Sequence, residues 1–184
     1  MEQKDAIKKL ATQARDNGAL IVSEIGSQTV WLHDGGDHAS HLYLSGPMGM
    51  APSVALGVAL SKPKTPVLAL CGDGALAMNL TALVTIAHQA PPNLTLAVMN
   101  NGIYDFTGAV PSPSTAINWQ HIITGLPNFE HFAEFDANTT VQFAADKGLG
   151  FIECMVRPAT EKAKPFPFTA PEIYARFLKY VQAE

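Results

Sequence analysis

Charged residues are scarce in this sequence of 184 amino acids. Lysine and arginine together number 12 and aspartate and glutamate 16, so only 15% of the chain is charged, against about 25% in typical globular proteins. The basic residues are scattered and the net charge is -4, which argues against nucleic-acid binding, because contacts to phosphates require clustered basic side chains. The shortage of charge also suggests that much of the surface faces another protein.

Long apolar runs and paired cysteines are missing as well. No apolar run approaches the roughly 20 residues of a transmembrane helix, and residues 1–16 are a charged amphipathic stretch rather than a signal peptide. The two cysteines, Cys71 and Cys154, lie in or at the end of apolar runs, which predicts buried thiols rather than a disulfide or a zinc site. We therefore expect a cytoplasmic protein that does not contact membranes.

Helical and extended patterns alternate along the chain. Strands that are apolar along their whole length are expected at residues 19–23, 42–44, 67–70, 94–99 and 149–156, and helices at 4–15, 51–60, 76–87, 139–147 and 171–181. This order predicts an α/β fold with a doubly wound, mainly parallel sheet and helices on both faces. The length predicts a single domain over residues 1–184.

The turns that follow the strands are the informative segments, because an open parallel sheet binds ligands at the carboxyl ends of its strands. Gly72-Asp73-Gly74 follows an apolar strand and precedes a helix. The glycines would let backbone N–H groups approach an anion while the carboxylate of Asp73 holds a cation. A hairpin turn is the alternative for this tripeptide, but the strand-to-helix pattern around it favours a metal and phosphate site.

A second turn offers neutral oxygen ligands. Twenty-five residues separate Gly74 from Asn100-Asn101-Gly102-Ile103-Tyr104, which follows the next apolar strand. Mg²⁺ takes six oxygen ligands and is usually bound by one or two protein side chains together with phosphates of the substrate. A carboxylate, an amide and a backbone carbonyl would leave coordination positions for a diphosphate and water. Asn-Gly is also a hairpin signal, which the strand-to-helix pattern again disfavours.

The combination of Gly72-Asp73-Gly74 with Asn100-Asn101 resembles the cofactor signature of thiamine-diphosphate-dependent decarboxylases. The resemblance covers essentially the whole chain and is to their diphosphate-binding domain. It implies thiamine diphosphate and Mg²⁺ as cofactors, with Mg²⁺ bound by Asp73, the side chain of Asn101 and the backbone carbonyl of Ile103. The implied cofactor contacts also include Ser27 and Gln28 on the terminal phosphate, the backbone at Gly72, Gly74 and Ala75, and Tyr104.

Residues 45–49, Ser-Gly-Pro-Met-Gly, are similar to the pyrimidine loop of this family. The resemblance implies that the carbonyl of Gly46 accepts a hydrogen bond from the 4′-amino group of the cofactor. It also implies that Met48 forces the cofactor into the bent shape in which its own imino group can remove the C2 proton. Gly46 and Met48 are therefore the expected catalytic residues, although an isolated methionine would be a core residue.

The resemblance implies an activating glutamate on a separate pyrimidine-binding domain, which this chain lacks. Glu24, the best-placed acid, precedes the diphosphate loop, at the wrong end of the cofactor. We therefore expect a partner α subunit that supplies the glutamate, in an α₂β₂ or larger assembly. Residues 100–108 look most like the β subunit of sulfopyruvate decarboxylase and the C-terminal part of phosphonopyruvate decarboxylase, which implies a carboxy-lyase subunit acting on a small 2-oxo acid.

The identity of that 2-oxo acid is open at the sequence level. Ala109-Val110 stands where those relatives usually have Gly-Gln, and the loop 105–116, long enough to be a lid, has no basic residue for a sulfonate or phosphonate. The contact would come from the partner or from Tyr104, Thr107 or Asn118. We prefer 3-sulfopyruvate; phosphonopyruvate, or pyruvate with carboligation as in acetolactate synthase, is the alternative.

Two other interpretations belong to different classes. The chain could be a non-catalytic scaffold subunit that retains the cofactor cradle, or a plain phosphate-binding module, although intact residues at all four turns argue against lost function. The histidines and aspartates of segment 33–41 could suggest a metal cluster, but their spacing fits no standard site, and we expect a solvated loop there.

Overall fold

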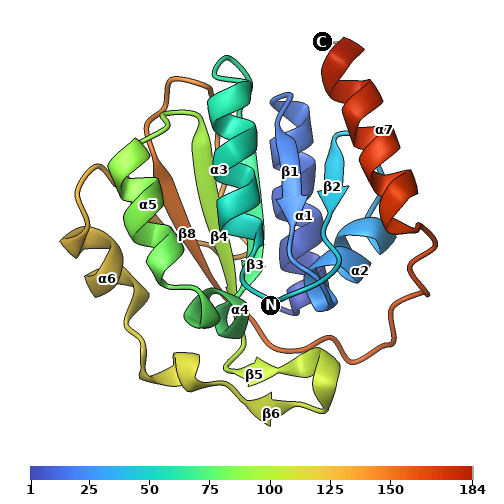
Figure 1. Cartoon of the computed structure of the whole chain (residues 1–184). Coiled ribbons are helices and arrows are strands. Elements are labelled where there is room, and N and C mark those ends of the chain that lie inside the picture. Colours follow the sequence, from blue (N-terminus) through green and yellow to red (C-terminus); the bar gives the residue numbers. More distant parts are fainter. Residues whose placement is uncertain (184) are drawn as a thin grey trace.

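A computed structural model describes residues 1–183 of the chain. Six strands form one sheet in the order β2-β1-β3-β4-β8-β7, and every neighbouring pair is parallel (Figure 1). In that order the strands are His41–Tyr43, Leu20–Ser23, Val67–Gly72, Leu94–Asn100, Gly150–Met155 and His131–Glu134. The short strands β5 (Ile103–Tyr104) and β6 (Val110–Pro111) pair separately as an antiparallel hairpin.

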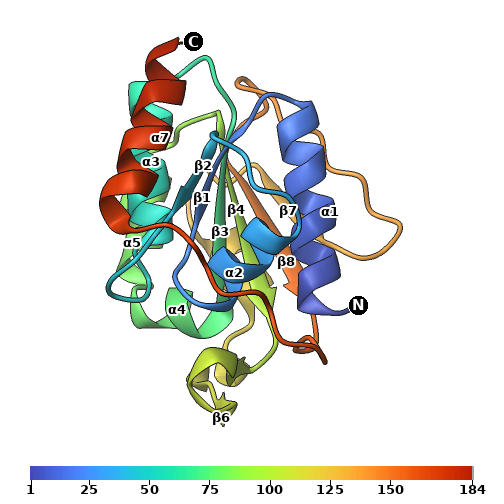
Figure 2. The same cartoon turned by 90° about the vertical axis from the view of Figure 1, so that its right-hand side faces the viewer.

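Helices cover both faces of the sheet, as Figure 2 shows from the side. Helices α3 (Ala51–Ser61), α5 (Thr81–Gln89) and α6 (Trp119–Gly125) pack on one face, and α1 (Gln3–Asp16) and α2 (Ser27–Asp34) on the other. Helix α7 (Ala170–Ala183) lies beside the edge strand β2, and the short helix α4 (Asp73–Met78) follows β3 directly. The predicted doubly wound α/β fold is confirmed.

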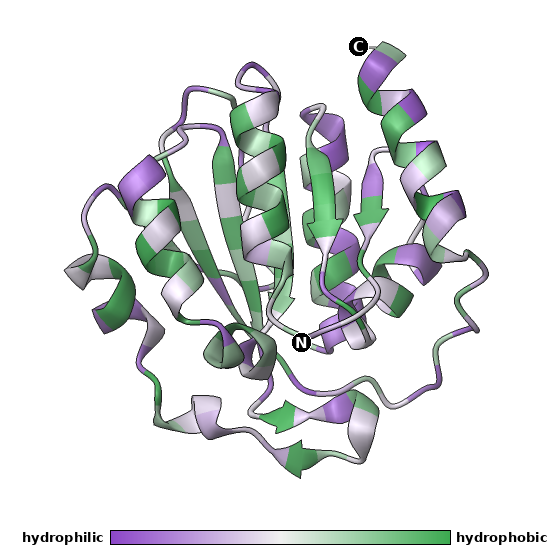
Figure 3. Ribbon diagram, in the orientation of Figure 1, coloured by the Kyte–Doolittle hydropathy of each residue, from purple (hydrophilic) through white to green (hydrophobic). Residues whose placement is uncertain are grey.

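The core consists of two layers, one on each side of the sheet. Successive side chains of a strand point to opposite faces, so Val67, Ala69 and Cys71 enter the layer under α3 and α5, while Leu68 and Leu70 enter the layer under α1. Strand β3 is buried on both faces, which explains why its sequence is apolar throughout. Figure 3 shows the same concentration of hydrophobic residues on the strands and on α3.

Both cysteines are buried free thiols, as predicted. Burial raises the pKa of the Cys71 and Cys154 thiols above the ordinary value, and the carboxylates of Glu24 and Glu153 add to this effect. Within residues 1–183, no helix is both long enough and apolar enough to cross a membrane.

The helix predicted over residues 139–147 is wrong. The side chain of Asp136 instead accepts hydrogen bonds from the backbone N–H groups of Asn138 and Thr139, which stabilises a turn. Gln13 of α1 then binds the backbone of Thr139 and Val141 and holds the segment in a non-helical path. Local side-chain hydrogen bonds of this kind compete with helix formation.

Sequence patterns also failed for several elements that precede this segment. The helix expected over 76–87 is two helices, α4 and α5, separated at Asn79, whose backbone is not helical. Helix α6, strand β7 and the β5–β6 hairpin were not predicted. Each is short, so none provides enough residues for a clear periodicity.

The order of the strands creates a crevice at one end of the sheet. The chain leaves β1 toward the face covered by α1 and leaves β3 toward the face covered by α3 (Figure 1). Where neighbouring parallel strands send their connections to opposite faces, an opening forms at their carboxyl ends, and ligands bind there. The turns singled out in the sequence follow β1, β2, β3 and β4 and therefore meet at this crevice.

Candidate functional site

One cavity lies at this crevice and is walled by all four turns. It is lined by every residue predicted to contact the cofactor or the metal ion: Ser27, Gln28, Gly46, Met48, Gly72, Asp73, Gly74, Ala75, Asn101, Ile103 and Tyr104. Thr107 also lines the cavity, whereas Asn118 lines a neighbouring one. The structure thus brings together the residues that the sequence separates by up to 77 positions.

Asp73 begins α4 and is only 2% exposed. Its Oδ2 atom accepts hydrogen bonds from the backbone N–H of Gly102, at 3.1 Å, and from the hydroxyl of Ser114. Its Oδ1 atom accepts none from residues 1–183. A carboxylate that is oriented through one oxygen and has its second oxygen unengaged is well suited to bind a metal ion through the second.

The turn at Asn101 is linked directly to Asp73, because Gly102, the next residue, donates its backbone N–H to the Asp73 carboxylate. The Oδ1 atom of Asn101 accepts the backbone N–H of Ile103 at 3.0 Å, and its Nδ2 atom donates to Oε1 of Gln3 at 3.2 Å. Gly102 has φ +71°, a conformation that glycine adopts readily. The two turns predicted to share a metal ion are therefore adjacent.

Two glycines of the first turn have no room for a side chain. A Cβ atom at Gly72 would lie 2.9 Å from Nε2 of Gln28, and one at Gly74 would lie 2.4 Å from Cε1 of Tyr104 and 2.8 Å from Oγ of Ser112. The side chain of Gln28 and the ring of Tyr104 thus lie directly against the backbone of the Gly-Asp-Gly turn. Close packing therefore requires glycine at both positions.

Ser27 contacts a different turn of the cavity wall. Its hydroxyl donates a hydrogen bond to Oδ2 of Asp105 at 3.2 Å, and both residues line the cavity. An anion that accepted the Ser27 hydroxyl would replace Asp105 as the acceptor. The turn after β1, which carries Ser27, and the segment after β5, which carries Asp105, are therefore coupled by a hydrogen bond that such a ligand would replace.

Glu24 occupies a structural position that the sequence did not indicate. It is fully buried, and its Oε2 atom accepts the backbone N–H groups of Gly49, at 3.0 Å, and Ala51, at 3.2 Å. Burial raises the pKa of the Glu24 carboxyl, although these donors oppose the shift. The carbonyl of Gly49 accepts from Nδ2 of Asn79 at 2.8 Å. Loop 45–50 is therefore held from both sides, and Met48 within it is 37% exposed.

Several contributors to the site come from segments that the sequence did not single out. Gln3 lies just before the helix predicted over residues 4–15, and Ser112 and Ser114 lie in the predicted lid loop 105–116. The Ser112 side chain accepts the N–H of Ser114, and Ser-Pro-Ser is typical of a helix N-cap. That signal could have located the turn but not its contact with Asp73.

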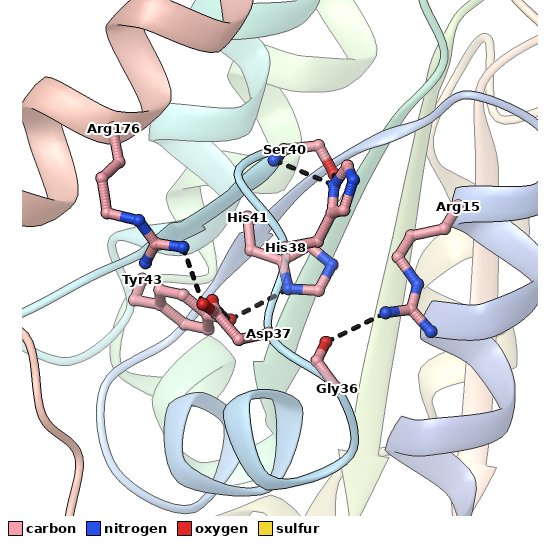
Figure 4. Close-up of polar contacts among 8 residues, drawn as sticks. All are labelled: Arg15, Gly36, Asp37, His38, Ser40, His41, Tyr43 and Arg176. Carbon is pink, nitrogen blue, oxygen red and sulfur yellow. Dashed lines mark hydrogen bonds and ion pairs between the residues drawn. The ribbon is translucent and has the colours of Figure 1, made fainter.

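The histidine-rich segment forms a polar network at the edge of the sheet (Figure 4), and none of its residues lines the cavity. Arg176 of α7 pairs with Asp37 at 2.7 Å, the hydroxyl of Tyr43 donates to Asp37 at 2.8 Å, and Nδ1 of His41 lies 3.0 Å from that hydroxyl. Because Tyr43 gives its proton to Asp37, His41 must donate from Nδ1. The network ties α7 to β2.

The prediction of a solvated loop is wrong for His41, which is 2% exposed, although Asp34 and His38 are exposed. Burial lowers the pKa of His41 to about 3, and the positive charge of Arg15 acts in the same direction. In residues 1–183, no three histidine, cysteine or acidic side chains are grouped to hold a metal ion. A metal site among these histidines is therefore not supported.

Comparison with known proteins agrees with this geometry. Residues 24–145 match the family described as "Thiamine pyrophosphate enzyme, C-terminal TPP binding domain". The β subunit of sulfopyruvate decarboxylase from Methanothermobacter thermautotrophicus is 33% identical over 99% of this chain and 96% of its own length. Phosphonopyruvate decarboxylase from Streptomyces viridochromogenes is 40% identical over 94% of this chain but only 44% of its own length.

Solved structures show the same fold. A putative thiamin diphosphate-dependent enzyme from Mycobacterium smegmatis superimposes with a TM-score of 0.66 over 86% of this chain and 32% of that chain, at 21% identity. The chain thus spans nearly the whole of one relative and less than half of the others. The match over residues 24–145 and the identity with the β subunit along its whole length place the chain in the thiamine pyrophosphate enzyme family, as a member built on its C-terminal TPP-binding domain.

Proposed function

We propose that this chain is the β subunit of a two-chain, thiamine-diphosphate-dependent decarboxylase of 3-sulfopyruvate. The observation that carries the proposal is the single cavity in which the four turns meet around Asp73. The similarity to a sulfopyruvate decarboxylase β subunit over the whole chain supports the choice of reaction. Residues 1–184 form one diphosphate-binding domain in this proposal.

The residues of the cavity fit Mg²⁺ and a diphosphate. Asp73 offers a carboxylate oxygen that accepts no hydrogen bond within residues 1–183, and Asn101 and Ile103 add neutral oxygens, the donor set that Mg²⁺ prefers. Gly72 and Gly74 add no side chain of their own beside the backbone N–H groups that would meet the phosphates. One carboxylate and one amide leave the remaining coordination positions to phosphate and water.

The proposal gives each residue that lines the cavity a role. Asp73, Asn101 and the carbonyl of Ile103 bind Mg²⁺, and the backbone at Gly72, Gly74 and Ala75 binds the diphosphate. The side chains of Ser27 and Gln28 donate to the terminal phosphate, and Tyr104 packs against the Gly-Asp-Gly turn.

Loop 45–50 would face the reacting end of the cofactor. The carbonyl of Gly46 would accept a hydrogen bond from the aminopyrimidine, and Met48 would support the bent shape of the cofactor and exclude water. Gly46 has φ +117°, and a Cβ atom at this position would have no neighbour within 4 Å. The backbone of Gly46 is therefore open to a ligand. Bound thiamine diphosphate supplies the nucleophilic carbon and the electron sink that decarboxylation of a 2-oxo acid requires.

A partner chain completes the site. The chain spans nearly all of a relative named as a subunit but only 44% of phosphonopyruvate decarboxylase from Streptomyces viridochromogenes, so a second chain would correspond to the remaining part of the single-chain enzyme. That α subunit supplies the activating glutamate, in an α₂β₂ or larger assembly. Met48, Met50 and Phe106, exposed by 37%, 39% and 68%, provide apolar surface near the cavity for it.

The reconstituted enzyme tests this proposal. The chain and its α subunit are purified separately, mixed with Mg²⁺ and thiamine diphosphate, and assayed for CO₂ release. We expect release only when both chains are present, with the highest kcat/KM for 3-sulfopyruvate. A higher value for phosphonopyruvate would favour the second candidate, which the 40% identity supports. Cofactor binding without release from 3-sulfopyruvate, phosphonopyruvate or pyruvate would contradict an enzymatic role and favour a scaffold subunit.

A further inference from the structure

Gln3 contributes a buried amide to the cavity wall that no sequence motif indicates. It is 0% exposed, and its Nε2 atom has no hydrogen-bond partner within residues 1–183. Four side chains of the described part of the chain have such a buried, unpartnered polar atom, and Gln3 is the one among them that lines the cavity at the carboxyl ends of the strands. A buried donor without an acceptor destabilises a protein, so this group requires an explanation.

Long-range contacts place Gln3 at the cavity. The residue begins α1, and its backbone N–H donates to the carbonyl of Arg157, just beyond β8, at 2.9 Å. Glu2 forms an isolated parallel bridge with the same Arg157. The first turn of α1 is thereby fixed next to the turn that follows β4, which carries Asn101.

A chain of hydrogen bonds determines which end of the Gln3 amide is unpartnered. The N–H of Ile103 donates to Oδ1 of Asn101, so Nδ2 of Asn101 must be the atom that faces Gln3. That Nδ2 donates to Oε1 of Gln3 at 3.2 Å. Both protons on Nε2 of Gln3 therefore lack an acceptor. Exchanging the oxygen and nitrogen of the Gln3 amide would break its bond to Asn101, and exchanging those of Asn101 would break both bonds.

We propose that Gln3 is a ligand-binding residue that donates a hydrogen bond to a non-bridging phosphate oxygen of the bound diphosphate. The nitrogen is shielded from bulk solvent and Gln3 lines the cavity, so we assign the acceptor to a group that binds in the cavity. A water on Mg²⁺ does not suit, because its lone pair is directed at the metal and it donates both protons. Phosphate oxygens are strong acceptors.

The same hydrogen bonds give Gln3 a second effect on the site. By accepting from Nδ2, Gln3 keeps Oδ1 of Asn101 on the side of the Ile103 turn. One residue of α1 thus orients a metal ligand and binds the phosphate at the same time. This inference rests on the proposed function, because it requires that the occupant of the cavity is a diphosphate.

The test compares Gln3→Met with Gln13→Met in the complex with the α subunit. Gln13 lies on the same helix, but both ends of its amide are used, by Thr139 and Val141. The dissociation constant of thiamine diphosphate in the presence of Mg²⁺ is measured by calorimetry. A hydrogen bond to a charged group contributes about 1.5–3 kcal/mol, so Gln3→Met should weaken binding by roughly 10- to 150-fold, and Gln13→Met should leave it unchanged.

Two further measurements separate binding from folding. The melting temperature without cofactor should fall less in Gln3→Met than in Gln13→Met. Gln3→Met loses one hydrogen bond from Asn101 but also removes an unpartnered buried donor, whereas Gln13→Met loses two paired hydrogen bonds to the backbone. Competition with magnesium pyrophosphate should show the same loss of affinity as thiamine diphosphate, since the contact is to the phosphates.

Equal cofactor affinity of the wild-type protein and Gln3→Met would overturn the assignment. So would a loss for thiamine diphosphate with none for pyrophosphate, which would place Gln3 at another part of the cofactor. Failure of the wild-type complex to bind thiamine diphosphate would instead contradict the proposed function itself, so the two failures are distinguishable.

Discussion

Replacing Gly74 by alanine should disturb both the stability of the protein and the cofactor site. The new Cβ would lie 2.4 Å from Cε1 of Tyr104 and 2.8 Å from Oγ of Ser112, whereas ordinary contacts begin at 3.4 Å. The ring would have to retreat by about 1 Å, and overpacking of this kind costs about 1–3 kcal/mol. Because Tyr104 belongs to β5 and Ser112 follows β6, the displacement would move the β5–β6 hairpin as a whole.

The second consequence of Gly74→Ala concerns binding. Ile103, the expected metal ligand, is the neighbour of Tyr104 in β5, so a displaced hairpin would move its carbonyl away from Mg²⁺. Loss of one contact to a charged group corresponds to a dissociation constant roughly 10- to 150-fold larger. Urea unfolding measures the first effect and calorimetric titration with thiamine diphosphate and Mg²⁺ the second. At this chain length, each kcal/mol lowers the melting temperature by about 2–4 °C.

Gly57→Ala is the matched control. Gly57 lies in α3, and a Cβ built there meets no atom within 4 Å. Alanine should stabilise that helix by up to about 1 kcal/mol, with no effect on the cofactor. If Gly74→Ala unfolds at the wild-type urea concentration and binds the cofactor normally, the packing of Tyr104 against this turn is not as described.

Three further predictions concern groups outside the metal site. Glu24→Ala leaves the N–H groups of Gly49 and Ala51 without their acceptor. The free energy of unfolding, measured with urea, should therefore fall by about 2 kcal/mol or more, and calorimetric titration should show a lower affinity for thiamine diphosphate. Wild-type values for both would contradict the positioning of loop 45–50 by Glu24. The pKa of His41 falls from 6.5 to about 3 on folding. Between these two pH values the unfolded chain binds a proton at His41 that the folded chain does not bind. The stability that is present above pH 6.5 is therefore lost progressively as the pH falls toward 3. His41→Asn should therefore reduce the pH slope of the unfolding free energy by up to about 1.4 kcal/mol per pH unit, and an unchanged slope would refute the shift. Arg176→Ala removes a partly exposed ion pair and should lower the free energy of unfolding by about 1 kcal/mol or less. Amide hydrogen exchange in α7 should become faster. Unchanged exchange would mean that packing alone holds that helix.

Features that depend on a short stretch of sequence could be predicted. Apolar strands and the glycines after them are local patterns, and the switch point of a parallel sheet brings such turns together whatever the intervening residues are. This is why Asp73 and Asn101, which lie on separate strands, could be assigned to one site in advance.

Features that depend on distant residues could not be predicted in the same way. Gln3 reaches the cavity because the segment before α1 pairs with Arg157, and nothing near Gln3 in the sequence signals this. Residues 139–147 carry a pattern compatible with a helix, yet Gln13, more than 120 positions away, holds them in another conformation. Burial of Glu24 likewise depends on loop 45–50 folding over it.

Calorimetric titration of the two-chain complex with thiamine diphosphate tests the central claim most directly. It is carried out with Mg²⁺ or with a chelator, on the wild-type protein and on Asp73→Asn, a substitution of nearly equal size that removes the charge. The account predicts tight, Mg²⁺-dependent binding by the wild-type protein and a loss of that dependence, with much weaker binding, in Asp73→Asn. Equal, Mg²⁺-dependent affinity of the two proteins would contradict the assignment of Asp73 as the anchor of the metal and diphosphate.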